Sequence, residues 1–230
     1  MARGWRGSVD CVWAAPAGDP ASAAYVLYTS GSTGTPQGVV QAQGHVLQHV
    51  LAWTGRLGVA GADRLGALSA VGYDAAVQDL FGALLRGAAW LPMDLRGQDR
   101  EALLDWCASA GLTVWHGTPT AYRYLFGGHV ACRQDLSAIR RVVLGGEAAR
   151  RSDLELFRAG FARGAQLVNG YGLTEATAVL QWYADHDTVV AGELLPVGTV
   201  VGDQAVRLLD AAGAEAAVCG ELVVASDYLA

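Results

Sequence analysis

The chain has 230 residues, 52% of them hydrophobic and 17% charged, a balance typical of a globular protein with a sizeable core and unlike that of a disordered chain. Its 16 basic and 22 acidic residues give a formal net charge of −6, so nucleic acid is not an expected primary partner. The four cysteines form no C-x-x-C pair, which argues against a zinc site, and no stretch has the ~20 apolar residues of a membrane span, so a soluble, cytoplasmic protein is expected.

Residues 1–20 show little periodicity and are predicted to form a lead-in segment. The apolar run at residues 23–27 predicts a buried strand, and YTSGSTGTPQGV follows it at residues 28–39. Glycines in this loop can adopt positive φ, and its hydroxyls and backbone N–H groups together suit phosphate oxygens. The loop lacks the spacing G-x-x-x-x-G-K-[ST], so a Walker-type nucleotidase is not indicated. A flexible surface linker is the alternative interpretation.

Helix and strand patterns then alternate. Val46, Val50, Trp53 and Leu57 form one stripe of an amphipathic helix that ends near residue 58. Strands are predicted at residues 64–70, 88–91, 112–115, 141–144 and 166–169. Further helices are predicted at residues 99–109, 119–126 and 153–162.

Two helices carry more specific local signals. Val77, Leu80, Phe81 and Leu84 recur at helical spacing and predict the apolar face of a helix that ends near residue 87. The sequence SDLE at residues 152–155 has the pattern of a capping box and predicts the start of the helix at 153–162.

The alternation predicts an α/β fold with a largely parallel sheet flanked by helices. Ligands of such sheets collect at the carboxyl ends of the strands, where the hydroxyl-rich loop, Gly145 to Glu147 and residues 169–175 are all expected to lie. Short strands at residues 196–201, 206–209 and 221–224 predict a small antiparallel β-region. We therefore expect an α/β core at residues 21–185 and a β-rich segment at residues 186–230.

Three stretches together resemble the adenylation domains of nonribosomal peptide synthetases, which belong to the adenylate-forming, or AMP-binding, superfamily. They are YTSGSTGTPQGV at residues 28–39, YDAAVQDLF at residues 73–81 and NGYGLTE at residues 169–175, in the family's order. The resemblance runs from about residue 20 to residue 230. It implies activation of an amino acid by ATP and magnesium as an aminoacyl adenylate, for loading onto a peptidyl carrier protein or domain.

The resemblance also implies roles for particular residues. Thr174 would contact the α-phosphate and Glu175 would ligate magnesium, so these two are the expected catalytic residues. Asp74 would bind the α-ammonium group of the substrate. The expected ATP-binding residues are Thr29, Ser30, Gly31, Ser32, Thr33, Gly34, Gly145, Gly146, Glu147, Asn169, Tyr171 and Gly172. The expected lining of the substrate side-chain pocket is Ala75, Gln78, His116, Val143, Gly145, Gly170, Ala178 and Val179.

Three of these residues also have purely structural interpretations. Asp74 suits the N-terminus of the helix that starts near residue 75, a role compatible with substrate binding. His116 could equally be a core histidine with satisfied hydrogen bonds. Glu175 could be a solvated acid near a helix N-terminus, where a carboxylate is favoured.

The chain departs from the family's pattern in several places. Gln37 stands where the loop usually carries lysine, and Leu173 stands where proline is usual. The family's ribose-binding motif, its hinge and its C-terminal subdomain with the catalytic lysine are not found in these residues. We therefore expect an incomplete large N-terminal subdomain, cut within its β-rich segment and inactive alone. A degenerate, non-catalytic nucleotide-binding or assembly module is the alternative.

Overall fold

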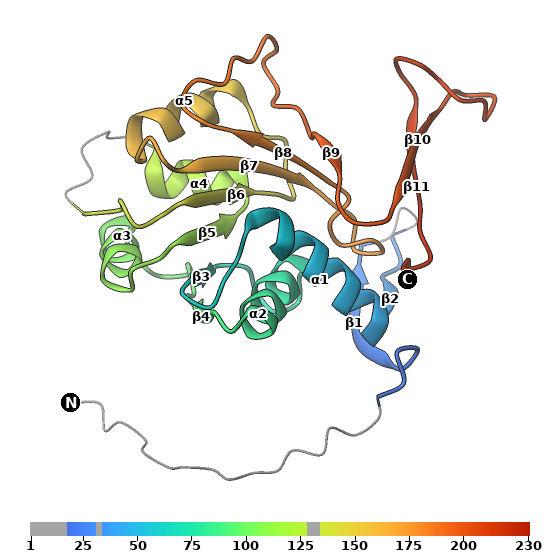
Figure 1. Ribbon diagram of the computed structural model, residues 1–230, viewed down its shortest axis with the longest axis horizontal. Coiled ribbons are helices and arrows are strands. Elements are labelled where there is room, and N and C mark those ends of the chain that lie inside the picture. Colours follow the sequence, from blue (N-terminus) through green and yellow to red (C-terminus); the bar gives the residue numbers. More distant parts are fainter. Residues whose placement is uncertain (1–17, 31–33, 128–133) are drawn as a thin grey trace.

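A computed structural model describes residues 18–30, 34–127 and 134–230. A seven-stranded sheet lies at its centre (Figure 1). In spatial order its strands are β4 (Ala89–Pro92), β3 (Arg64–Ala67), β5 (Val114–Gly117), β6 (Arg141–Leu144), β7 (Gln166–Tyr171), β8 (Leu180–Ala184) and β9 (Thr199–Val200). Neighbours from β4 to β7 are parallel, whereas β8 and β9 are added antiparallel. The prediction of a largely parallel sheet in an α/β fold is confirmed.

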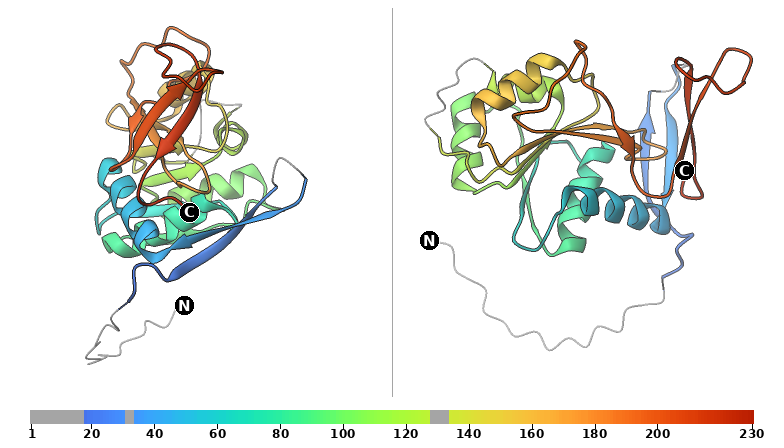
Figure 2. Two further views of the ribbon diagram at one scale, coloured as in Figure 1. Left: turned by 90° about the vertical axis from the view of Figure 1, so that its right-hand side faces the viewer. Right: turned by 45° about the horizontal axis from the view of Figure 1, so that its top comes forward.

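Helices cover both faces of this sheet (Figures 1 and 2). One face is covered by α1 (Gln43–Leu57) and α2 (Asp74–Arg86), and the other by α3 (Arg100–Ser109), α4 (Pro119–Phe126) and α5 (Arg151–Gly160). Alternate residues of a strand point to opposite faces. In β5, Val114 therefore packs with the α1 and α2 side, while Trp115 packs among the side chains of α3, α4 and α5.

The apolar stripe of α1 is buried as its periodicity predicts, whereas Val77, Leu80 and Phe81 of the face predicted for α2 are only half-buried. Leu84 is 61% exposed, and the buried side of α2 instead carries Ala76, Asp79 and Ala83. Small residues let α2 approach α1 closely, since a Cβ added at Gly82 would lie 3.0 Å from the Trp53 ring. The small residues of α2 are therefore its buried side, because they allow the close approach of α1.

The cap of α5 lies two residues before the one that the sequence predicts. The helix begins at Arg151, and the Asp153 carboxylate accepts the backbone N–H of Arg150 at 2.7 Å. Asp153 also accepts a hydrogen bond from Arg123 Nε at 2.7 Å. This ion pair joins α4 to α5. Asp153, which is almost fully buried, therefore caps the helix in place of the predicted SDLE box.

Two hairpins lie outside the central sheet. The first pairs β1 (Ala23–Thr29) with β2 (Gln37–Ala42), and the second pairs β10 (Ala205–Leu209) with β11 (Glu221–Ala225), both antiparallel. The hydroxyl-rich loop therefore connects the two strands of a hairpin and does not follow a strand of the main sheet. Within the described residues, no helix combines the length and the apolar character needed to cross a membrane.

Candidate functional site

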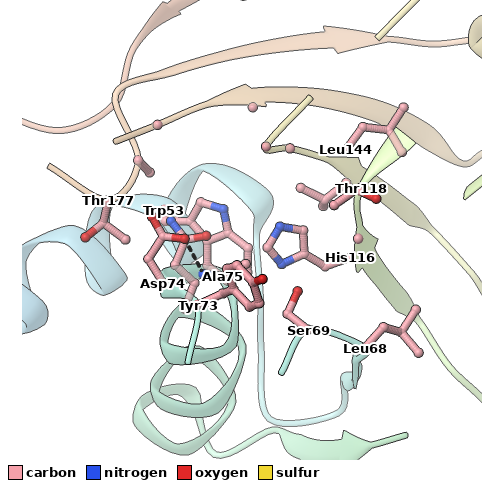
Figure 3. A pocket seen from close by; sticks show the side chains of 18 of the residues that line it. Trp53, Leu68, Ser69, Tyr73, Asp74, Ala75, His116, Thr118, Leu144 and Thr177 are labelled. Carbon is pink, nitrogen blue, oxygen red and sulfur yellow. Dashed lines mark hydrogen bonds between the residues drawn. The ribbon is translucent and has the colours of Figure 1, made fainter. Parts of the chain in front are cut away.

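A cavity of about 390 Å³ opens where β5, β6 and β7 end, at their carboxyl edge (Figure 3). His116 of β5 lines it, together with residues 145–146, which follow β6, and residues 170–172, at the end of β7. Trp53 of α1 and Asp74 at the start of α2 form the opposite wall. This position agrees with the rule that parallel sheets bind ligands at the carboxyl ends of their strands.

Many of the residues predicted from sequence meet at this cavity, although they come from distant parts of the chain. Those that line it are Asp74, Ala75, Gln78, His116, Val143, Gly145, Gly146, Gly170, Tyr171, Gly172 and Ala178.

Three other predicted residues lie outside the lining. Val179 is fully buried in a separate apolar cluster. Asn169 is buried and donates from Nδ2 to the Pro196 carbonyl at 2.8 Å. The Glu147 carboxylate accepts hydrogen bonds from the backbone N–H and the hydroxyl of Thr120, at 3.1 and 2.5 Å. The side chains of Asn169 and Glu147 therefore form hydrogen bonds within the protein.

The described residues that were predicted to contact phosphate are not part of the cavity lining. Thr29, Ser30 and Gly34 do not line it, while Gly31, Ser32 and Thr33 lie outside the described residues. The carbonyls of Thr174 and Glu175 both accept from Gln41 Nε2, at 3.0 and 2.9 Å. Since Gln41 belongs to β2, it ties the first hairpin to the loop after β7.

The Glu175 side chain is exposed. In the part of the chain that the structure describes, no cluster of three or more His, Cys, Asp or Glu side chains is positioned to hold a metal. Magnesium bound to a nucleotide needs only one or two carboxylates, because phosphate oxygens and water complete its shell. A single accessible carboxylate at Glu175 fits such an ion, but not a metal held by protein ligands alone.

Asp74 lies at the start of α2 but is not its N-cap, as the sequence predicts, because the N-cap is Tyr73. It is the first residue of α2, its Oδ1 accepts the Ala75 N–H at 2.8 Å, and it also lines the cavity. Burial raises the pKa of Asp74, while the Ala75 N–H and the nearby His116 act in the opposite direction. A cation bound beside this carboxylate would offset the cost of its desolvation.

His116 forms a buried pair with Asp79 of α2. Its Nδ1 lies 2.7 Å from Asp79 Oδ1, and its ring centroid lies 5.5 Å from that of Trp53. Burial alone would lower the pKa of His116, but the Asp79 carboxylate, and to a lesser degree Asp74, raise it above its ordinary value. His116 is thus both satisfied on one nitrogen and part of the cavity wall.

Several lining residues were not predicted from the sequence as site residues, among them Trp53, Thr177 and Gln181. Trp53 belongs to the apolar stripe of α1, which gave no functional signal. Thr177 has a φ of 55°, a left-handed conformation that is strained for a β-branched residue and is found most often at functional sites. Gln181 lies on β8, a strand that the sequence pattern did not predict, and its buried Nε2 has no hydrogen-bond partner.

Comparison with known proteins gives a consistent family. The model of the AMP-binding enzyme family matches residues 6–230. The chain is 35% identical over 214 residues to syringomycin synthase SyrB1 of Pseudomonas syringae pv. syringae, covering 88% of this chain and 34% of that protein. It is 30% identical over 214 residues to the L-proline–[L-prolyl-carrier protein] ligase of Streptomyces coelicolor, covering 91% of this chain and 40% of the ligase. The chain thus spans well under half the length of these relatives.

Solved structures show the same relationship. The nonribosomal peptide synthetase FmoA3 in its α-methyl-L-serine-AMP bound form aligns with a TM-score of 0.80 at 29% identity, over 91% of this chain and 24% of that one. IdnL7 aligns with a TM-score of 0.79 at 29% identity, over 92% of this chain and 42% of that one.

Proposed function

Because the chain belongs to the AMP-binding enzyme family, we propose that its cavity binds ATP and an amino acid and supports their conversion to an aminoacyl adenylate. The observation that carries the proposal is the convergence on one cavity of Asp74, His116 and the glycine-rich ends of β6 and β7. The names of the relatives agree with it, since one is a ligase that acts on proline and a carrier protein, and one solved structure holds an amino acid joined to AMP.

In this proposal Asp74 binds the α-ammonium group. The carboxylate is desolvated, so an ion pair formed there is stronger than one in water. Fixing the ammonium orients the substrate carboxylate toward the α-phosphate for in-line attack, which releases pyrophosphate and requires mainly positioning and neutralisation of charge. The Tyr171 ring packs against the adenine, beside the backbone of Gly145 and Gly146.

The loop after β7 and the hydroxyl-rich loop serve the phosphates. Thr174 donates its hydroxyl to the α-phosphate, and residues 29–34 hold the departing pyrophosphate. Glu175 would hold magnesium, which neutralises phosphate charge when bound. Gln41 fixes the backbone of Thr174 and Glu175, so β2 sets the position of both side chains.

The proposed partner of the product is a peptidyl carrier protein or domain in nonribosomal peptide synthesis. All 16 basic residues of the chain are arginines, so it offers no lysine to act as the family's catalytic lysine. We therefore expect these 230 residues to bind ATP and the amino acid but to need a lysine-bearing subdomain for steady turnover. Steady amino-acid-dependent pyrophosphate exchange by the purified chain would contradict that expectation.

Calorimetric titration with ATP and with AMP tests the binding step. Magnesium-dependent ATP binding that is lost in Glu175→Ala supports the proposal, with Glu155→Ala on the exposed side of α5 as the matched control. Absence of binding by either nucleotide would favour a degenerate assembly module, an alternative that Gln37 in place of the usual lysine also supports.

A further inference from the structure

The Asp79–His116 pair is a buried ion pair that the packing of the core does not require. Both side chains are buried, with 1% and 5% of their surface exposed, and the two residues lie 37 positions apart in the chain. Asp79 Oδ2 has no hydrogen-bond partner. A buried carboxylate with one unsatisfied oxygen is costly, and its one partner is the ring that faces the cavity.

Asp79 determines which nitrogen His116 offers to the cavity. Because Nδ1 is held 2.7 Å from Asp79 Oδ1, the nitrogen that remains for a ligand is Nε2. A Cβ added at Gly145 would lie 3.9 Å from this Nε2, which places it over the Gly145 backbone, in the same cavity as Gln78 and Val143.

The surroundings of the ring favour a proton on Nε2. Burial acts to lower the pKa of His116 and raises that of Asp79, but the Asp79 and Asp74 carboxylates of α2 outweigh burial at His116 and raise its pKa. Trp53 of α1 and Val143 of β6 contribute no titratable group. With Nδ1–H donated to Asp79, a charged ring presents Nε2–H as a donor to the cavity.

We propose that His116, positioned by Asp79, donates this hydrogen bond to an oxygen on the side chain of the substrate, so that the pocket selects amino acids with a neutral carboxamide or hydroxyl group. The inference rests on the proposed function, in which Asp74 binds the α-ammonium group. The Asp79 charge is then matched by His116 and the Asp74 charge by the substrate, so no unpaired charge is left for an ionised side chain. An ammonium side chain has only hydrogen-bond donors, so it cannot accept from His116 Nε2–H, and the charged ring would repel it.

Nonhydrolysable aminoacyl-sulfamoyl adenosines test this selection on the full 230-residue chain by calorimetry. Three shape-matched pairs isolate the oxygen: asparaginyl with leucyl, glutaminyl with methionyl, and threonyl with valyl. We expect at least one pair to show about 10-fold tighter binding of the oxygen-bearing member, the size of one hydrogen bond to a charged group. Equal affinity within all three pairs, or tightest binding of an ornithinyl analogue, would overturn the inference while leaving adenylate binding intact.

Variants separate positioning from packing. His116→Phe keeps a ring against Trp53 but removes the donor, so the preference should disappear, whereas His116→Gln should keep part of it. Asp79→Asn should lower the pKa of His116, measured by NMR titration, and shift the preference to lower pH, while the matched control Asp187→Asn at an exposed site should change neither. A preference that persists in His116→Phe would refute the role of His116. Failure of every analogue to bind would overturn the proposed function itself, and the substrate class with it.

Discussion

Replacing Asp63 with asparagine should destabilise the protein at neutral pH and much less in acid. Asp63 precedes β3, at the amino ends of the strands and so opposite the cavity. Its carboxylate accepts hydrogen bonds from the Thr113 hydroxyl at 2.6 Å and from Arg140 Nη2 at 2.6 Å. Arg140 also donates to the carbonyl of Gly58, at the end of α1. The network therefore anchors the helix that carries Trp53 into the cavity.

The magnitude follows from the pKa of Asp63. Burial would raise this pKa, but hydrogen bonds from Arg140, Thr113 and the Ala60 N–H lower it from 3.8 to about 2. One pH unit of pKa corresponds to about 1.36 kcal/mol, so the ionised carboxylate stabilises the fold by about 2.5 kcal/mol. Because the pKa is lower in the folded state, this stability is present above pH ~4 and is lost as pH falls toward 2.

Urea unfolding of wild type and Asp63→Asn at pH 7 and at pH 3 measures this contribution. The variant should lose about 2.5 kcal/mol of unfolding free energy at pH 7, and the difference should shrink by roughly half at pH 3. Asp187→Asn is the control, because its ion pair with Arg163 is exposed and 3.4 Å long, and such pairs contribute at most about 1 kcal/mol. A loss below about 0.5 kcal/mol at pH 7, or a difference that does not change with pH, would refute the reasoning.

Three further predictions concern the cavity and the loop after β7. Asp74→Asn should weaken binding of aminoacyl-adenylate analogues by about 10- to 100-fold while leaving AMP binding unchanged, as measured by calorimetry, because it removes one charged hydrogen bond. Gly172→Ala should cost at least about 2 kcal/mol in urea unfolding, because its Cβ would lie 1.8 Å from the Thr177 carbonyl oxygen, whereas Gly160→Ala, where nothing lies within 4 Å, should cost little. Gln41→Ala should lower magnesium-ATP affinity more than AMP affinity, because it releases the two carbonyls of the loop after β7; equal effects on both nucleotides would argue against that coupling.

The sequence by itself determined the fold class and the family. Local periodic patterns predicted the stripe from Val46 to Leu57 and the strand at residues 141–144, and the family motifs are contiguous in sequence. These predictions do not require knowledge of what packs against each element. Asp74 was also predicted on local grounds, because its position at the helix start and its place in a motif are both local properties.

Only the tertiary structure decided which surfaces are buried and which side chains meet. In α2 the most buried side carries small residues and not the predicted apolar face, because α1 lies close to α2. The periodicity of one helix does not encode such a contact. β2 and β8 were not predicted from the sequence, and in the structure each pairs antiparallel with a neighbouring strand. The Asp79–His116 pair joins a helix to a strand 37 residues away, and such a contact exists only once the sheet brings β5 beneath α2.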